Sequence, residues 1–178
     1  IHPKLVTAVN QVDPSKLKQV YYDVPRNMKL SLLVHLLQQE KAGLVMVFCN
    51  TRKSTDFVAK SLKANRIDAI AVHGGLSQNK RTRTIDLFNR SKVEVLVCTD
   101  VASRGLHIDD VSHVYNFDIP KEAKDYVHRI GRTARAGEAG KAISLLCDYD
   151  YDNFTRVLQE YSFNIEKLER PHLRRIEL

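Results

Sequence analysis

A short segment, from His128 to Gly137, carries the side chains of this sequence that are best suited to hold a phosphate. It reads HRIGRTARAG and places three arginines and a histidine within eight residues. Positive charges this close repel one another unless carboxylates or an anion lie between them. Arginine forks match phosphate oxygens in bidentate geometry. We therefore favour a phosphate ligand, or a phosphoryl-transfer transition state, over the alternative of a structural salt-bridge cluster.

Two of these arginines are expected to stand out from the domain. Gly131 should end the preceding helix. Arg132 and Arg135 would then lie on the loop that follows, where they can extend from the domain edge rather than pack within it. Such a placement suits contact with a phosphate that is held outside this domain.

A second basic cluster lies at the start of an expected helix. Gln78 and Arg81 are three residues apart, so they share one face of that helix, and Ser77 is a suitable N-cap. The free N–H groups of a first helical turn attract anions, and Lys80 and Arg83 add positive charge. A solvated basic face is the alternative for this cluster.

Small or polar residues also follow four of the expected strands. Ligands bind outside the carboxyl ends of the strands in an open parallel sheet. Ordinary turn chemistry explains any one of these exits, but four together indicate a ligand-binding edge. The exits are Asn50-Thr51-Arg52, His73-Gly74-Gly75, Thr99-Asp100 and Asn116-Phe117-Asp118.

The elements that must position these residues alternate between strand and helix patterns. This alternation predicts an α/β domain with three layers, in which a mostly parallel central sheet has helices on both faces. We expect strands at 20–24, 44–49, 69–72, 93–98, 111–117 and 142–147. We expect helices from 30 to an end at Gly43, around Phe57, Val58 and Leu62, and at 77–88, 122–130 and 154–161.

The chain divides into three expected parts. Residues 1–16 are interpreted as a leading arm or linker, 17–161 as the folded domain, and 162–178 as a charged, solvated tail. A tail that grips RNA is the alternative. Because the first residue is Ile1 and no secretory signal follows, we expect the chain to have been cut from a longer one.

Composition narrows the class of protein. The 178 residues are 43% hydrophobic and 28% charged, which excludes disorder, collagen and coiled coil, and no apolar run is long enough to span a membrane. The formal net charge of +7 favours a polyanion as partner. The three cysteines, Cys49, Cys98 and Cys147, are expected to be buried thiols in a reducing, cytoplasmic compartment rather than zinc ligands.

Two nucleotide-binding features are missing from the sequence. It contains no GxxxxGK[ST] loop to hold a nucleoside triphosphate. It also has no Asp-Glu pair after a hydrophobic strand where Mg²⁺ would be held. The chain thus has phosphate-reaching arginines without a nucleotide pocket of its own.

These motifs resemble those of the second, C-terminal RecA-like domain of the DEAD-box RNA helicases. The likeness covers about residues 20–158. The segment 128–135 matches the HRxGRxxR motif at each fixed position, and 99–105 matches TDxxxRG. Phe48-Cys49-Asn50-Thr51 fits FxxT, and Gln78-Asn79-Lys80-Arg81 fits QxxR. The order and spacing of the elements make the match specific.

The resemblance implies roles for particular residues. ATP and Mg²⁺ would be held mainly by a preceding N-terminal RecA-like domain of the same protein. Arg132 and Arg135 would act as arginine fingers, with Gly105 and His107 near the ribose. Asp100, Arg104, His128 and Arg129 would couple the two domains. The RNA backbone, single-stranded or duplex, would be held by Thr51, Arg52, Gly74, Gln78, Arg81 and Thr99.

One position departs from the family pattern, and two other functions stay open. His107 stands where the family usually has an aspartate that bonds the ribose, and Asp109 or Asp110 are the alternative candidates for that contact. The implied activity is the separation of short RNA duplexes, without a membrane partner. The alternatives are a stand-alone module that binds single-stranded nucleic acid, and the matching domain of a DNA helicase of the same superfamily.

Overall fold

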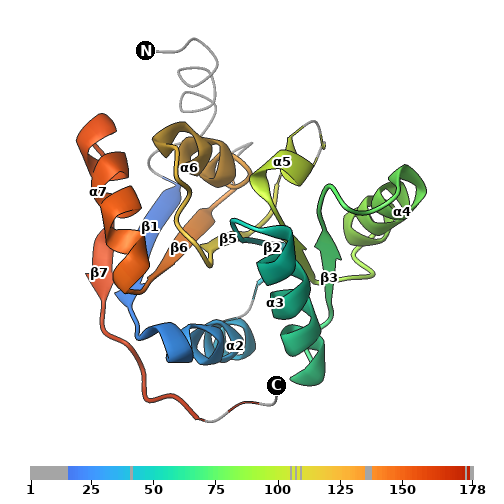
Figure 1. The fold of residues 1–178 in the computed structure, drawn as a ribbon, viewed down its shortest axis with the longest axis horizontal. Coiled ribbons are helices and arrows are strands. Elements are labelled where there is room, and N and C mark those ends of the chain that lie inside the picture. The colour runs from blue at the N-terminus through green and yellow to red at the C-terminus, as the bar shows by residue number, and fades with distance from the viewer. Residues whose placement is uncertain are drawn as a thin grey trace.

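The central feature of the computed structural model is a seven-stranded sheet in the order β3-β4-β2-β5-β6-β1-β7 (Figure 1). Every pair of neighbouring strands is parallel. The structure describes residues 16–40, 42–104, 106, 108, 110–134, 138–174 and 176. The strands are β1 (Leu17–Asp23), β2 (Val45–Phe48), β3 (Ala69–Val72), β4 (Val95–Cys98), β5 (His113–Asn116), β6 (Gly140–Leu146) and β7 (Glu166–Leu168).

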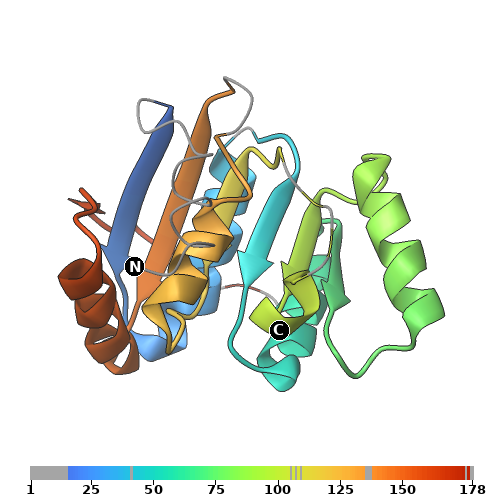
Figure 2. The same cartoon turned by 90° about the horizontal axis from the view of Figure 1, so that it is seen from above.

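Helices cover both faces of this sheet (Figure 2), as the sequence predicted. Two short 3₁₀ helices precede the longer helices α2 and α7 along the chain. The helical elements are η1 (Arg26–Met28), α2 (Lys29–Gln39), α3 (Arg52–Ala64), α4 (Gln78–Asn89), α5 (Asp100–Ser103), α6 (Ala123–Ile130), η2 (Asp148–Asp150) and α7 (Tyr151–Glu160).

The two faces follow from the alternation of side chains along each strand. Val45 and Val47 of β2 pack in a cluster with residues of α2 and α3. Met46 and Phe48 point the other way and pack with residues of α4 and α5. Because both sets are apolar, β2 is buried on both faces, which explains its uninterrupted hydrophobic run.

Helix α3 confirms the helix expected around Phe57, Val58 and Leu62. Its buried face is formed by Val58, Ala59 and Leu62, together with Thr55. Phe57 is 52% exposed. The apolar spacing of 58, 59 and 62 already completes a helical stripe, which leaves Phe57 on the solvent side.

Helix α2 ends at Gln39 rather than at Gly43. Glu40 leaves the helix with an extended backbone (φ −95°, ψ 122°). Its carboxylate accepts a hydrogen bond of 2.9 Å from Lys141 and lies 3.2 Å from His113 Nε2. Glu40, the first residue after α2, therefore contacts β5 and β6 through its side chain at the point where the helix ends.

The C-terminal segment is not simply a solvated tail, as had been predicted for 162–178. Residues 166–168 form β7, which pairs in parallel with β1 at the edge of the sheet. Leu168, Leu173 and Ile176 pack against the main core cluster. Arg170 and Arg174 remain exposed. The segment thus mixes apolar anchors with charged residues.

The burial predicted for the cysteines is confirmed. Cys49, Cys98 and Cys147 are free thiols, and each is at most 1% exposed. Within the part of the chain that the structure describes, no helix is both long and apolar enough to cross a membrane.

Candidate nucleic-acid and phosphate site

The four strand exits lie at the same edge of the sheet, as predicted, because all of its strands run in parallel. The exits of β2, β4 and β5 are joined by one side chain of α6, that of Arg129. The exit of β3 is adjacent to the exit of β2. A Cβ atom placed on Gly74 would lie 2.9 Å from Arg52 Nη2.

Arg129 is buried, with 1% of its surface exposed. Its Nε and Nη2 donate to the two carboxylate oxygens of Asp100, both at 2.7 Å. The guanidinium also donates to Asn50 Oδ1, Asn116 Oδ1 and the carbonyl of Asp118. The salt-bridge alternative therefore holds for Arg129, and the phosphate interpretation is wrong for this side chain. The predicted role of Arg129 in coupling the two domains stays a prediction.

Arg104 and His128 form a more exposed group around Asp125. Arg104 Nη2 donates to Asp125 Oδ1 at 2.7 Å, and His128 Nδ1 lies 3.9 Å from the same oxygen. Burial lowers the pKa of His128 below its usual value, although the charge of Asp125 opposes this effect. We expect a neutral imidazole at pH 7. The predicted coupling role of Arg104 and His128 stays a prediction.

The predicted RNA contacts of the β2 and β3 exits lie at the surface. Thr51 is the N-cap of α3, and its hydroxyl oxygen accepts from the backbone N–H of Ser54 at 3.1 Å. Arg52 and Gly74 are exposed. The first turn of α3 contains no acidic residue, so its positive end and Arg52 together favour an anion.

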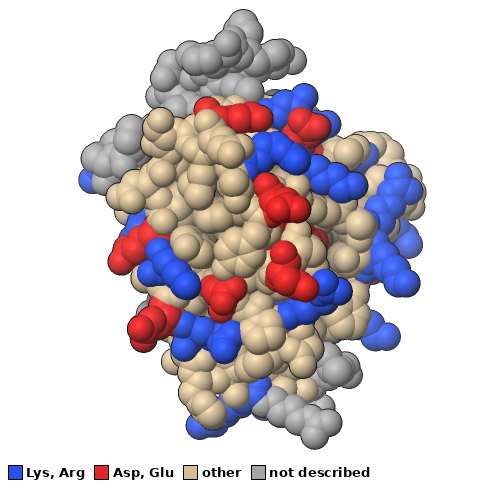
Figure 3. Space-filling model, turned by 60° about the vertical axis from the view of Figure 1, so that its left-hand side comes forward, with Lys and Arg blue, Asp and Glu red and all other residues tan. Residues whose placement is uncertain are grey.

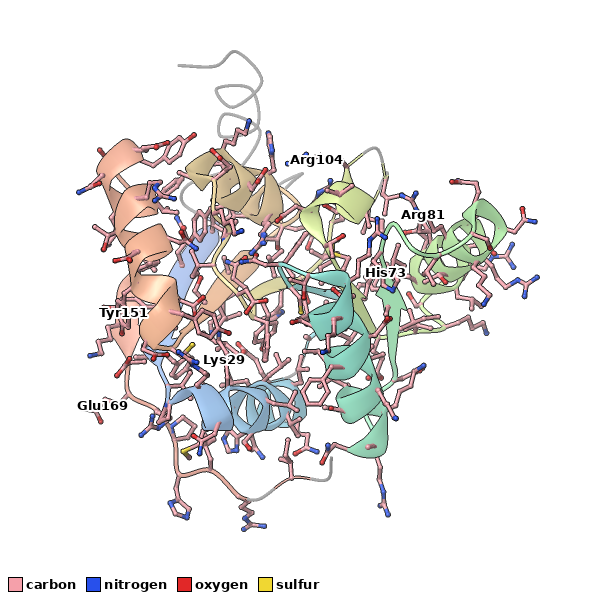
Figure 4. All side chains as sticks on the ribbon, viewed as in Figure 1. Lys29, His73, Arg81, Arg104, Tyr151 and Glu169 are labelled. Carbon is pink, nitrogen blue, oxygen red and sulfur yellow. The ribbon has the colours of Figure 1, made fainter. Side chains whose placement is uncertain are left out.

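Helix α4, which begins four residues after Gly74, presents a second basic surface, and Arg81 on this helix is labelled in Figure 4. Ser77 caps α4 by accepting from the N–H of Lys80, as predicted. Gln78 is exposed. Arg81 Nη2 donates to the carbonyl of Ala102 at 3.4 Å, and its buried Nε has no hydrogen-bond partner among the described residues.

Thr99, the last of the predicted RNA contacts, is mostly buried (7% exposed). Its hydroxyl oxygen accepts from the N–H of Ala102 at 3.3 Å and so caps α5. This side chain supports the loop after β4, and its contact with RNA stays a prediction.

Arg132 does not extend from the domain edge, contrary to the prediction. Its guanidinium donates to the carbonyls of Ser103, Leu106 and Ile108, at 2.7, 2.8 and 3.2 Å. Gly131 does end α6, but with a right-handed backbone (φ −66°) instead of the left-handed cap. The chain therefore turns back toward the loop after α5, and Arg132 binds that loop.

Several predicted site residues lie outside the described residues. These are Arg135, Gly105, His107 and Asp109, together with all but the last residue of the leading arm 1–16. Their predicted roles stay predictions. Asp110, the other candidate for a ribose contact, has a left-handed backbone (φ 64°).

Sequence reasoning missed a buried ion cluster behind this edge. Lys29 is 2% exposed, and its ammonium group lies 2.6 Å from Asp150 and 3.6 Å from Asp118. Asp118 in turn accepts from the backbone N–H of Asn50. One signal for this cluster was available in the sequence. Lys29 lies on the same helical stripe as the buried residues Leu32, Leu33 and Leu36 of α2, at the spacing i, i+3, i+4, i+7.

Comparisons with known proteins agree with this architecture. The model of the family described as "Helicase conserved C-terminal domain" matches residues 28–137. The solved structure of E. coli DEAD-box protein SrmB, bound to regulator of ribonuclease activity A, superposes with a TM-score of 0.83. It is 39% identical, over 92% of this chain and 99% of that one. The chain belongs to this family, as the C-terminal RecA-like domain of a DEAD-box helicase.

Two further relatives extend the comparison of this DEAD-box domain. ATP-dependent RNA helicase DDX47 of Drosophila melanogaster is 45% identical over 142 residues, which are 80% of this chain but only 28% of that protein. The structure of S. cerevisiae Dbp5 bound to RNA and ADP BeF3 has a TM-score of 0.82 and 30% identity. That match covers 90% of this chain and 43% of Dbp5. The chain thus spans less than a third of the curated relative.

Proposed function

We propose that this domain is the C-terminal half of the core of an ATP-dependent RNA helicase, which separates short RNA duplexes locally. The observation that carries the proposal is the single edge of the sheet where four strand exits gather beside two basic surfaces. The relatives named as ATP-dependent RNA helicases, and Dbp5 with RNA, support RNA as the partner.

The RNA backbone would bind along the exits of β2 and β3 and the start of α4. The contacts proposed are Thr51, Arg52, Gly74, Gln78, Arg81 and Thr99. Helix starts, glycine backbone and arginine forks all recognise phosphates rather than bases, so this surface would bind RNA with little preference for sequence. On the face around α7, by contrast, Lys and Arg are interspersed with Asp and Glu (Figure 3).

ATP would be bound by a preceding RecA-like domain, which would also hold Mg²⁺. Arg132 and Arg135 are proposed as arginine fingers, as the family resemblance implies. Arg132 could serve this role only after it exchanges its carbonyl partners for phosphate oxygens, because its guanidinium binds three carbonyls here. In the arrangement described, Arg132 holds the carbonyls of Ser103, Leu106 and Ile108.

In this mechanism the two domains close over ATP and RNA, closure bends one RNA strand, and reopening of the cleft follows hydrolysis. This domain contributes the backbone contacts and the rigid edge on which they stand. The N-terminal domain of the same protein and RNA are therefore the proposed partners, and a cytoplasmic location stays a proposal.

The experiment that tests this function compares RNA and DNA as activators. The full-length parent protein should hydrolyse ATP faster with single-stranded RNA than with DNA of the same sequence, and the 178-residue chain alone should show no RNA-stimulated hydrolysis. Equal stimulation by DNA would favour the DNA helicase. A parent sequence without a GxxxxGKT loop and an Asp-Glu-Ala-Asp run would favour the stand-alone binding module. ATP turnover by the isolated chain would contradict the half-domain assignment.

A further inference from the structure

The turn that follows β3 is held by a side-chain pair to which no role has been assigned so far. His73 is 7% exposed and directly follows the last residue of β3. Its Nε2 lies 3.0 Å from both carboxylate oxygens of Asp56 on α3. Its Nδ1 lies 3.0 Å from the backbone nitrogen of Gly75. The imidazole thus bridges a helix and the turn that carries Gly74.

The hydrogen bonds fix the position of the ring proton. A backbone N–H can only donate, so Nδ1 must accept from Gly75. The proton of the neutral ring therefore resides on Nε2 and is donated to the carboxylate of Asp56. The carboxylate selects the tautomer that can accept from Gly75.

The same turn is closed in two further ways. The backbone N–H of Leu76 donates to the carbonyl of His73 at 3.2 Å. A Cβ atom on Gly75 would lie 2.9 Å from Cε1 of His73, so the ring sits directly against this glycine. Gly74 is packed as closely against Arg52. The guanidinium of Arg52 thus lies beside Gly74, so the two proposed RNA-binding groups are neighbours on the surface.

We propose that Asp56 and His73 are positioning residues for the nucleic-acid site, which hold the Gly74–Gly75 turn in the conformation that binds an RNA phosphate. This inference rests on the proposed RNA-binding function. Asp56 is accessible, with 60% of its side chain exposed, and it carries a negative charge beside a site for a polyanion. Direct electrostatics therefore predicts that its removal strengthens RNA binding, whereas positioning predicts the opposite.

The two explanations predict changes of opposite sign, so RNA affinity distinguishes them. We would measure the affinity of the 178-residue chain for a short fluorescein-labelled oligouridine. Asp56→Ala removes the acceptor, and we expect about fivefold weaker binding. Asp56→Asn keeps an acceptor oxygen while it removes the charge, so binding should be close to that of the unmodified chain. Asp86→Ala, which removes an exposed carboxylate from α4, is the matched control and should leave binding unchanged or slightly tighter.

A second readout separates positioning from loss of folding. Nitrogen NMR of His73 should show the Nε2-protonated ring in the unmodified chain, and the amide of Gly75 should exchange faster with solvent in Asp56→Ala while circular dichroism stays unchanged. Equal or tighter RNA binding by Asp56→Ala, or an unaltered Gly75 amide, would overturn the inference. If the unmodified chain binds no oligouridine, the proposed RNA-binding function fails instead, whatever the NMR result.

Discussion

The side chains of Arg129 and Asp100, which are 29 residues apart in the sequence, face one another through two hydrogen bonds of 2.7 Å each. One residue comes from the arginine-rich segment at the end of α6, and the other from the exit of β4. This bidentate pair joins α6 to the start of α5. It connects the arginine-rich segment to the predicted ligand-binding edge of the sheet.

Loss of this pair should destabilise the domain strongly. Arg129→Ala leaves the Asp100 carboxylate, whose side chain is only 19% exposed, without its partner, which costs about 3 kcal/mol. Arg129→Lys should recover little of the loss, because an ammonium group cannot replace a planar fork. Denaturant unfolding of the chain measures both. Arg90→Ala is the control: its pair with Asp86 is exposed on both sides, so a cost above about 1 kcal/mol there would contradict this reasoning.

The three thiols should be unreactive in the folded chain. Burial raises the pKa of Cys98 to about 12 and also raises the pKa of Cys49 and Cys147. The reactive thiolate is therefore scarce at pH 7. Titration with a thiol reagent should detect all three cysteines in denaturant and almost none under native conditions. Rapid labelling of Cys49 or Cys98 in the native chain would contradict their burial.

The fold was predictable from the sequence to a large extent, because it depends on local patterns. The continuous apolar runs at 44–49 and 93–98 identified buried parallel strands, and Ser77 marked a helix start that the structure confirms. Strand β7 was missed, since Glu166–Leu168 has only three residues and no alternation. Its position is set by pairing with β1, which is a non-local interaction.

Acid should remove the stabilisation that Glu40 provides. Burial raises the pKa of this carboxyl, but hydrogen bonds from Lys141 and His113 outweigh burial, and the net pKa is lowered. The unfolded chain therefore binds the proton more tightly than the folded one. The stabilisation is fully present above about pH 4.3, which is the ordinary pKa of a glutamate side chain. It is lost as the pH falls through the folded-state pKa.

Glu40→Gln tests this dependence. The variant should lose about 1 kcal/mol of unfolding free energy at pH 7, and the difference from the unmodified chain should shrink below about pH 4. Urea unfolding at several pH values gives the measurement. The neighbouring exposed carboxylate provides the control: Glu94→Gln should behave like the unmodified chain. If the unfolding free energies of Glu40→Gln and the unmodified chain differed by the same amount from pH 7 to pH 3, the proposed pH dependence would be wrong.

RNA binding should depend on salt as a backbone contact does. If about three phosphates are neutralised, log K should fall with log salt at a slope near −2, at roughly 0.7 per phosphate on single strands. Arg81→Ala should weaken all sequences about equally and reduce the slope by ~0.7. Arg90→Ala removes an equal charge from the far end of α4, where Arg90 pairs with Asp86, and should change the slope less. A strong preference among unrelated oligonucleotides would argue against backbone recognition.

The location of the candidate site was predictable from the sequence, but the burial and the hydrogen-bond partners of its individual side chains were not. Residue types at the strand exits indicate a ligand edge, because parallel strands end together. Sequence alone could not tell that Arg129 is buried while Arg52 is exposed, since both are arginines of motifs that indicate an anion ligand. That difference depends on Asp100 and Asn116, which the fold brings from distant positions.

The final prediction distinguishes the roles of Arg132 and Arg135, the other two arginines of the segment from His128 to Gly137. A charge that acts on the γ-phosphate in the transition state lowers the barrier more than it tightens ATP binding, and an arginine finger contributes about 10³-fold or more in rate. In the full-length protein, Arg135→Ala should therefore abolish most hydrolysis while ATP affinity changes little. Arg135→Lys should not rescue it. Single-turnover hydrolysis with saturating RNA, beside equilibrium ATP binding, measures both effects.

Arg132→Ala should behave differently, because Arg132 binds the carbonyls of Ser103, Leu106 and Ile108. Its loss should reduce hydrolysis and also lower the unfolding free energy of the chain by about 1–2 kcal/mol, since three partly buried carbonyl acceptors lose a charged donor. The stability measurement needs no ATP and no second domain, so it isolates the loop contact from catalysis. Unchanged stability would show that Arg132 is free to leave the loop, and near-normal hydrolysis in both alanine variants would remove the arginine-finger assignment.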